Sequence, residues 1–152
     1  MRFAPAAAAL SLCLVMTASV LSAGPGAAPD PRAAALIAQG QAALKAGESQ
    51  AATDAFEAAL AVDPGHTPIF INLAEAARQQ GLQGKAIRFY REALERDPGN
   101  FAAIAGEGAA LVEKGALEKA KRNLAKLQSL CGDACPETVA LQGTIARGPS
   151  AR

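Results

Sequence analysis

Residues 67–100 read TPIFINLAEAARQQGLQGKAIRFYREALERDPGN, and this stretch decides the fold. Gly81 divides it into two helical segments, because a helix readily ends where glycine adopts a left-handed backbone at little cost. The second segment ends at Asp97, since Pro98 disfavours helical geometry in the residue before it. The stretch therefore predicts two helices joined by a tight turn.

The same pattern occurs once before this stretch and partly again after it, at one fixed spacing. The glycines that end the first segments are Gly47, Gly81 and Gly115. The second segments align position by position, with Ala52, Phe56, Ala59, Leu60, Asp63, Pro64 and Gly65 matching Ala86, Tyr90, Ala93, Leu94, Asp97, Pro98 and Gly99, and with Ala120, Leu124 and Leu127 following in the third unit. Such a fixed period indicates a repeat architecture.

The period and these residues resemble the tetratricopeptide repeat, with units at 33–66, 67–100 and 101–134. Two departures are visible, since Gln39 and Glu107 replace a leucine and the third unit lacks its closing proline. The resemblance implies an all-α, right-handed solenoid of three helix–turn–helix repeats followed by a C-terminal capping helix. One hairpin cannot bury its own apolar face, so the units must stack.

Small and large residues alternate in a way that suits close helix packing. The small positions, which we expect to let the two helices of one hairpin approach, are Gly40, Ala74, Gly108, Ala52, Ala86 and Ala120. The large positions, Phe56, Tyr90 and Leu124, are expected to fill the space between neighbouring hairpins.

The C-terminal segment 135–147 is predicted to be the capping helix, with Thr138, Leu141, Gln142 and Ile145 at helical spacing over 136–146. Residues 148–152 are expected to form a disordered tail. Between the third unit and the cap lie Cys131 and Cys135, which are expected to form a disulfide that ties the two together. The alternatives are a redox-active pair and half of a metal site, but the only histidine, His66, lies two repeats away.

Residues 1–23 have the three parts of a secretory signal peptide. Arg2 is followed by an uncharged apolar stretch over 6–21 and then by small residues, so cleavage is expected near Ala23. A Pro/Ala/Gly-rich flexible linker over 24–32 would follow. We expect the mature protein to be periplasmic and not inserted in the membrane. The alternative is an inner-membrane anchor formed by an uncleaved signal.

Charge and composition exclude several functions. The chain has 15 basic and 14 acidic residues, and removal of Arg2 leaves 14 of each. This balance argues against a nucleic-acid partner. The first hairpin is acidic and the last is basic, which would permit head-to-tail self-association. No catalytic constellation or phosphate loop is present, so we expect no enzyme activity, no cofactor and no metal.

The resemblance places a partner-binding groove along the first helices of the hairpins. The groove residues it implies are Ile37, Gln41, Leu44, Ile71, Asn72, Glu75, Arg78, Ala105, Ala109 and Val112. The alternative is that Ile37, Leu44 and Val112 simply pack within their own hairpins.

Many tetratricopeptide cochaperones grip acidic C-termini with a two-carboxylate clamp. The corresponding residues here are Ile37, Gln41, Asn72, Ala102 and Gly106, and only Asn72 matches the clamp. A ligand carboxylate would lose hydration without gaining a cation. We therefore expect a neutral or apolar protein segment as the partner of a scaffold or assembly factor in the bacterial cell envelope. The alternative is a structural subunit that self-associates or stays permanently in one complex.

Overall fold

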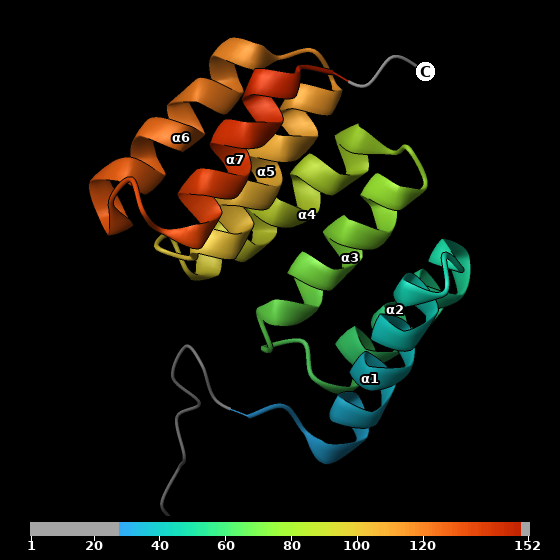
Figure 1. The fold of residues 1–152 in the computed structure, drawn as a ribbon. Coiled ribbons are helices and arrows are strands. Elements are labelled where there is room, and N and C mark those ends of the chain that lie inside the picture. The colour runs from blue at the N-terminus through green and yellow to red at the C-terminus, as the bar shows by residue number, and fades with distance from the viewer. Residues whose placement is uncertain (1–27, 150–152) are drawn as a thin grey trace, which may run out of the picture.

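The computed structural model describes residues 28–149. The predicted signal peptide, the first part of the predicted linker and residues 150–152 lie outside this range. Within it, the chain forms seven α-helices and no strand (Figure 1). They are α1 (Pro31–Lys45), α2 (Ser49–Val62), α3 (Pro68–Gln79), α4 (Gln83–Arg96), α5 (Phe101–Glu113), α6 (Leu117–Cys131) and α7 (Pro136–Arg147).

The helix ends follow the local sequence signals. Gly47, Gly81 and Gly115 all have a positive φ, and the amide of the residue after each bonds a carbonyl in the last turn of the preceding helix. This is the expected glycine-terminated helix end. At the other end, Asp30 caps α1 by accepting a hydrogen bond from the Arg32 amide. Helix α1 therefore begins at Pro31, inside the range 24–32 that was predicted to be a linker.

The helices stack as consecutive hairpins. Within hairpins, α1 packs on α2, α3 on α4 and α5 on α6, and successive hairpins meet through α2–α3 and α4–α5. Helix α7 packs on both α5 and α6 and covers one end of the stack (Figure 1). The predicted all-α solenoid with a C-terminal capping helix is confirmed.

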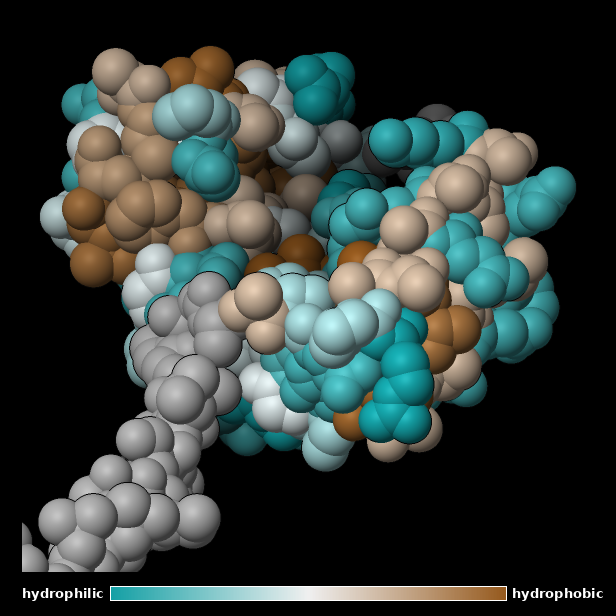
Figure 2. Space-filling view, turned by 90° about the horizontal axis from the view of Figure 1, so that it is seen from below, coloured by the Kyte–Doolittle hydropathy of each residue, from teal (hydrophilic) through white to brown (hydrophobic). Residues whose placement is uncertain are grey.

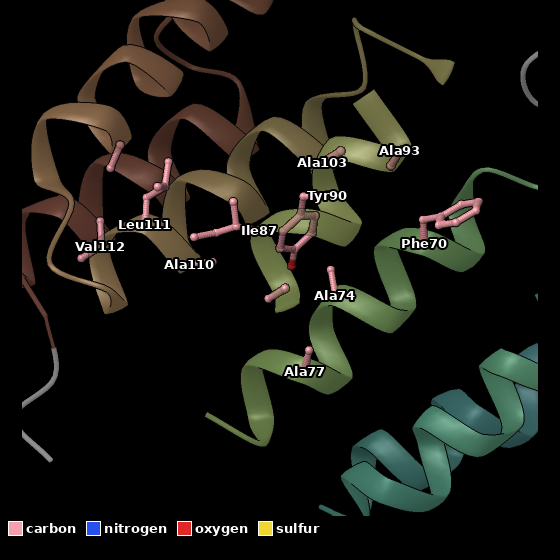
Figure 3. Close-up of a cluster of buried hydrophobic side chains, with 12 residues drawn as sticks. Phe70, Ala74, Ala77, Ile87, Tyr90, Ala93, Ala103, Ala110, Leu111 and Val112 are labelled. Atoms are coloured by element: carbon pink, nitrogen blue, oxygen red, sulfur yellow. The ribbon is translucent and has the colours of Figure 1, made fainter. Parts of the chain in front are cut away.

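The largest hydrophobic cluster joins the second and third hairpins. Figure 3 shows the Tyr90 ring of α4 at its centre, with Ala74 of α3 facing it. Tyr90 is completely buried, and Ala103 and Ala110 contribute from α5. A second cluster around Phe56 joins the first hairpin to Ile69 and Leu73 of α3. The expected role of Phe56 and Tyr90 between hairpins is therefore confirmed, although Leu124 stays partly exposed.

The small residues make close approaches, but not all where they were expected. A side chain on Gly40 would collide with Phe56 of the same hairpin. A side chain on Gly108 would instead meet Leu141 of α7, whose Cδ2 atom would lie 2.6 Å from the new Cβ. The prediction that Gly108 accommodates α6 was wrong, because the cap presses on this face of α5.

Glu107, which stands where the repeat usually has a leucine, is buried. Its Oε1 accepts a 2.8 Å hydrogen bond from Arg91 Nε of α4, and its Oε2 accepts a 3.0 Å bond from Asn123 Nδ2 of α6. The carboxylate therefore joins three helices by polar contacts where the repeat usually relies on packing, and these bonds offset the cost of burying it.

The repeat register predicts a measurable difference between two identical substitutions. Ala86 is fully buried in the central cluster, whereas Ala58 is exposed on α2. We expect Ala86→Leu to destabilise the chain by about 1–3 kcal/mol through overpacking. Ala58→Leu should change the free energy of unfolding by well under about 1 kcal/mol. Urea unfolding of both variants measures the difference, and equal midpoints would contradict the register.

Candidate partner-binding groove

The first helices of the hairpins lie on the inner side of the stack. Helix α3 contacts both α1 and α5, whereas α2, α4 and α6 make no such contacts with one another. The stack therefore curves toward α1, α3 and α5, as expected for the side that lines a groove. Figure 2 shows the surface hollowed between the two halves of the molecule, with hydrophobic residues at the base of the hollow.

The ten predicted groove residues differ in how accessible they are. Gln41 is exposed, and seven others are half-buried: Ile37, Leu44, Ile71, Asn72, Glu75, Arg78 and Ala105. Ala109 and Val112 are buried, and Val112 is completely inaccessible. The assignment of these two residues to the groove surface was wrong, because α3 and α7 both pack against α5.

The apolar groove residues of the first hairpin pack within the hairpin and also remain accessible from the groove. Ile37 and Leu44 pack against the cluster around Phe56 and yet keep part of their surface exposed. Ile71 does the same at the central cluster. Of Ile37, Leu44 and Val112, for which packing within the hairpin was the alternative, only Val112 is purely a core residue. A partner could therefore contact Ile37, Leu44 and Ile71 on rigid, well-supported side chains.

Arg78 is held by two carboxylates. Its Nη2 atom donates a 2.5 Å hydrogen bond to Glu113 Oε1 of α5, and its Nη1 atom lies 3.2 Å from Glu75 Oε1. Glu75 also accepts a hydrogen bond from the Tyr90 hydroxyl of α4. The network links α3, α4 and α5. Glu113, at the end of the first helix of the next repeat, is the partner that lies on another hairpin.

The network shifts the ionisation of its members. Burial lowers the pKa of Arg78, but the hydrogen bond to Glu113 and the charge of Glu75 outweigh it, so the net pKa is raised. Burial, with the charge of Glu75, also raises the pKa of Tyr90. Arg78 therefore stays charged and Tyr90 neutral, and the Arg78 side chain is only 22% exposed. Its guanidinium is already neutralised and is poorly placed to recruit a ligand carboxylate.

Asn72 differs from its charged neighbours. Its half-buried side chain makes no hydrogen bond within residues 28–149. The nearby Gln79, by contrast, donates to the carbonyl of Leu44. Asn72 therefore offers an amide donor and acceptor that could bond the backbone of an extended segment.

The carboxylate-clamp positions cannot be rebuilt by simple side-chain replacement. Gly106 is buried, and any side chain there would collide with the Tyr90 ring. Ile37 and Ala102, at two further clamp positions, carry no donor. The groove thus lacks both the cations and, at Gly106, the space that the clamp requires.

Cys131 and Cys135 are joined by a disulfide whose Cα atoms lie 5.7 Å apart. The bond connects the last residue of α6 to the residue that immediately precedes α7. Thr138 of α7 lies close by, with its Oγ1 atom 3.6 Å from Cys131 Sγ. The disulfide therefore holds the start of the capping helix against the third hairpin.

Within residues 28–149, no group of three or more His, Cys, Asp or Glu side chains is arranged to hold a metal ion. Among the helices of residues 28–149, none combines the length and the apolar character needed to cross a membrane. His66 lies in the turn between α2 and α3.

Comparison with known proteins agrees with this geometry. The sequence profile of the tetratricopeptide repeat matches residues 37–101, which span most of the first two repeats. No curated protein sequence matches the chain.

Several solved structures share the fold. The tetratricopeptide domain of Sgt2 from Aspergillus fumigatus superposes with a TM-score of 0.69 at 26% identity, covering 82% of this chain and 89% of that one. The second such domain of human RPAP3, in complex with an HSP70 peptide, has a TM-score of 0.67 at 21% identity, with coverage of 76% and 95%.

A bacterial structure is similar as well. The type III secretion chaperone SycD of Yersinia enterocolitica, in complex with a peptide of the translocator YopD, has a TM-score of 0.65 at 21% identity. The match covers 75% of this chain and 86% of that one. The chain therefore contains tetratricopeptide repeats over residues 37–101, and the seven-helix stack of residues 28–149 has the fold of these tetratricopeptide domains.

Proposed function

We propose that this chain is a non-enzymatic protein-interaction module that holds a neutral or apolar segment of a partner in the groove of α1, α3 and α5. The observation that carries the proposal is the state of the polar groups in the groove. Arg78, Glu75 and Glu113 satisfy one another, whereas Asn72 has no hydrogen-bond partner among the described residues and stands beside the half-buried Ile71. Such a surface favours backbone hydrogen bonds and apolar contacts over ionic ones.

Proteins of the same fold support a peptide as the ligand. Human RPAP3 is found in complex with the HSP70 peptide SGPTIEEVD, and SycD with a YopD peptide. The acidic HSP70 peptide is a poor fit for this chain, because the clamp positions here lack cations. The segment that binds this groove should therefore lack the acidic C-terminus of the heat-shock peptides.

We place this activity in the bacterial periplasm, where the module would act as a scaffold or assembly factor. The signal-like residues 1–23 motivate this location. A disulfide between Cys131 and Cys135 is compatible with it, since such bonds persist in oxidising compartments. N-terminal sequencing of the protein from its native host tests the location. A chain that starts near Gly24 would support export with cleavage, and one that still starts at Met1 would contradict it.

A peptide array scored with the purified chain tests the ligand class. We expect uncharged and apolar peptides to be captured in preference to peptides that end in Asp or Glu. Asn72→Ala should weaken capture about fivefold to twentyfold, the effect of one or two lost hydrogen bonds. Gln50→Ala, on the exposed face of α2, is the matched control and should leave capture unchanged. Preferential capture of acidic C-termini that Asn72→Ala abolishes would restore the clamp and refute the proposal.

A further inference from the structure

The capping helix continues the repeat register. A shift by one repeat carries Ile104 to Thr138, Glu107 to Leu141 and Leu111 to Ile145. Thr138 and Leu141 are buried like their counterparts on α5, and Ile145 packs against the core with part of its surface exposed. Helix α7 therefore packs in the same rotational orientation as α5. It occupies the place of the first helix of a fourth repeat.

This orientation places Val139 in the same row as known groove residues. Counting from the start of each unit, the fifth positions are Ile37, Ile71, Ala105 and Val139. The first three are half-buried and Val139 is 55% exposed. The row thus runs from α1 to α7 and extends the groove beyond the three helices that the sequence implied.

A second row lies one turn earlier on the same helices. The second positions of the units are Ala34, Pro68, Ala102 and Pro136. None of the residues in the two rows carries a charge or a hydrogen-bonding side chain. We call these two rows the apolar strip. It lies at the N-terminal ends of α1, α3, α5 and α7.

The opposite ends of α3 and α5 are occupied by a polar network. The Arg78–Glu113 ion pair bridges these two helices near their C-terminal ends, and Val112 beside it is completely buried. Between α3 and α5, the accessible apolar surface therefore lies at the end that carries the apolar strip. Figure 2 views the molecule from this end and shows hydrophobic residues over the C-terminal lobe, at the upper left.

The strip is not flat. On α5 it contains only alanines, Ala102 and Ala105, whereas its neighbours on α3 and α7 include Ile71 and Val139. From these side-chain sizes we infer a depression over α5, where the alanines lie between larger neighbours. Ala105 is half-buried there and Ala102 is exposed.

We propose that the partner segment lies across the apolar strip, from α1 to α7, and places one bulky apolar side chain over Ala105 between Ile71 and Val139. Adjacent helices lie about 8–10 Å apart, so four helices span roughly 24–30 Å. An extended segment of about eight or nine residues covers that distance. This inference rests on the proposed function and adds the position, the length and the central anchor of the segment.

The disulfide fixes the position of the fourth helix of the strip. Cys135 directly precedes Pro136, the first strip residue on α7, and its bond to Cys131 fixes that end of the helix to α6. The fourth helix of the strip is thereby held in register with the third. Reduction should loosen binding of a segment that spans all four helices more than binding of a shorter one.

Two exposed hydrophobic residues provide a matched test. Val139 belongs to the strip, whereas Leu130, 47% exposed, belongs to α6, the second helix of its hairpin. The probes are fluorescent uncharged nonapeptides with a central Phe, and pentapeptide truncations of them. We expect Val139→Glu to weaken binding of the nonapeptide at least tenfold. Leu130→Glu should leave the affinity for the nonapeptide unchanged. The affinity for the pentapeptide should differ only weakly between Val139→Glu and the parent chain.

A second variant tests the anchor. Ala105→Leu fills the depression over α5 from a half-buried position, and it should weaken peptides with a central Phe about tenfold more than peptides with a central Ala. Equal weakening of the two peptide sets would remove the anchor from the proposal. Thermal unfolding of each variant establishes that the fold persists.

The outcomes separate this inference from the proposed function through Ile71→Glu, which lies at the centre of any groove site. Loss of binding in Ile71→Glu but not in Val139→Glu would confine the partner to three repeats and overturn the inference alone. Failure of the parent chain to bind any peptide would overturn both. A change in sedimentation by Val139→Glu without a change in peptide binding would assign this face to a second copy of the chain and likewise overturn the inference.

Discussion

Tyr90→Ala is expected to destabilise the chain by about 3–5 kcal/mol, the cost of truncating a large buried aromatic side chain. Tyr90 is completely buried at the centre of the cluster that joins the second and third hairpins. Its ring also fills the space above Gly106, where α5 has no side chain. No neighbouring side chain can fill that space without moving a helix. Urea unfolding followed by circular dichroism measures the loss.

Tyr90→Phe separates the ring from the hydroxyl. It keeps the packing but removes the hydrogen bond to Glu75, and we expect a loss of about 1–2 kcal/mol. The smaller loss reflects Arg78, which still holds Glu75 by an ion pair. Equal losses for the two variants would mean that the polar network, and not the ring, joins the two hairpins.

Leu141→Ala should cost about 2–5 kcal/mol and should loosen the capping helix before the rest of the fold. Leu141 is almost completely buried, and it packs directly on Gly108 of α5. With that contact gone, α7 keeps Thr138 and Ile145 against the stack, together with the disulfide. Hydrogen exchange is the direct measurement, because it reports the stability of each helix separately.

The expected pattern is specific. Amides of α7 should exchange faster in Leu141→Ala, whereas those of α3 and α4 should keep most of their protection. Reduction of the disulfide should add to the effect, since a loop this short contributes about 2 kcal/mol in the chain-entropy account. Uniform acceleration over all seven helices would show instead that the cap and the stack unfold as one unit.

The sequence alone was enough for the repeat register and the helix ends. Both depend on local rules: glycine at a left-handed helix end, proline after the second helix and small residues at contact positions. Residues with a single strong local preference, such as Gly81 and Pro98, therefore fall where expected. The same reasoning located the capping helix, whose buried residues have helical spacing.

The accessibility of the groove required the tertiary structure. Val112 and Ala109 have the sequence register of groove residues but are covered, because α7 and α3 press on α5 from both sides. Local propensity carries no information about how far two neighbouring hairpins rotate toward each other. The same rotation brings Glu113 to Arg78, so this ion pair between two repeats could not be deduced from one repeat.

What the sequence by itself determined is therefore the repeating unit: its length, its helices and its turns. What only the tertiary structure decided is the surface that the stacked units leave open. It joined the C-terminal ends of α3 and α5 through Arg78 and Glu113 and left Val139 of α7 exposed. The physical reason is that helix formation depends on neighbours in the chain, whereas exposure depends on side chains of different repeats, which meet only when the hairpins stack.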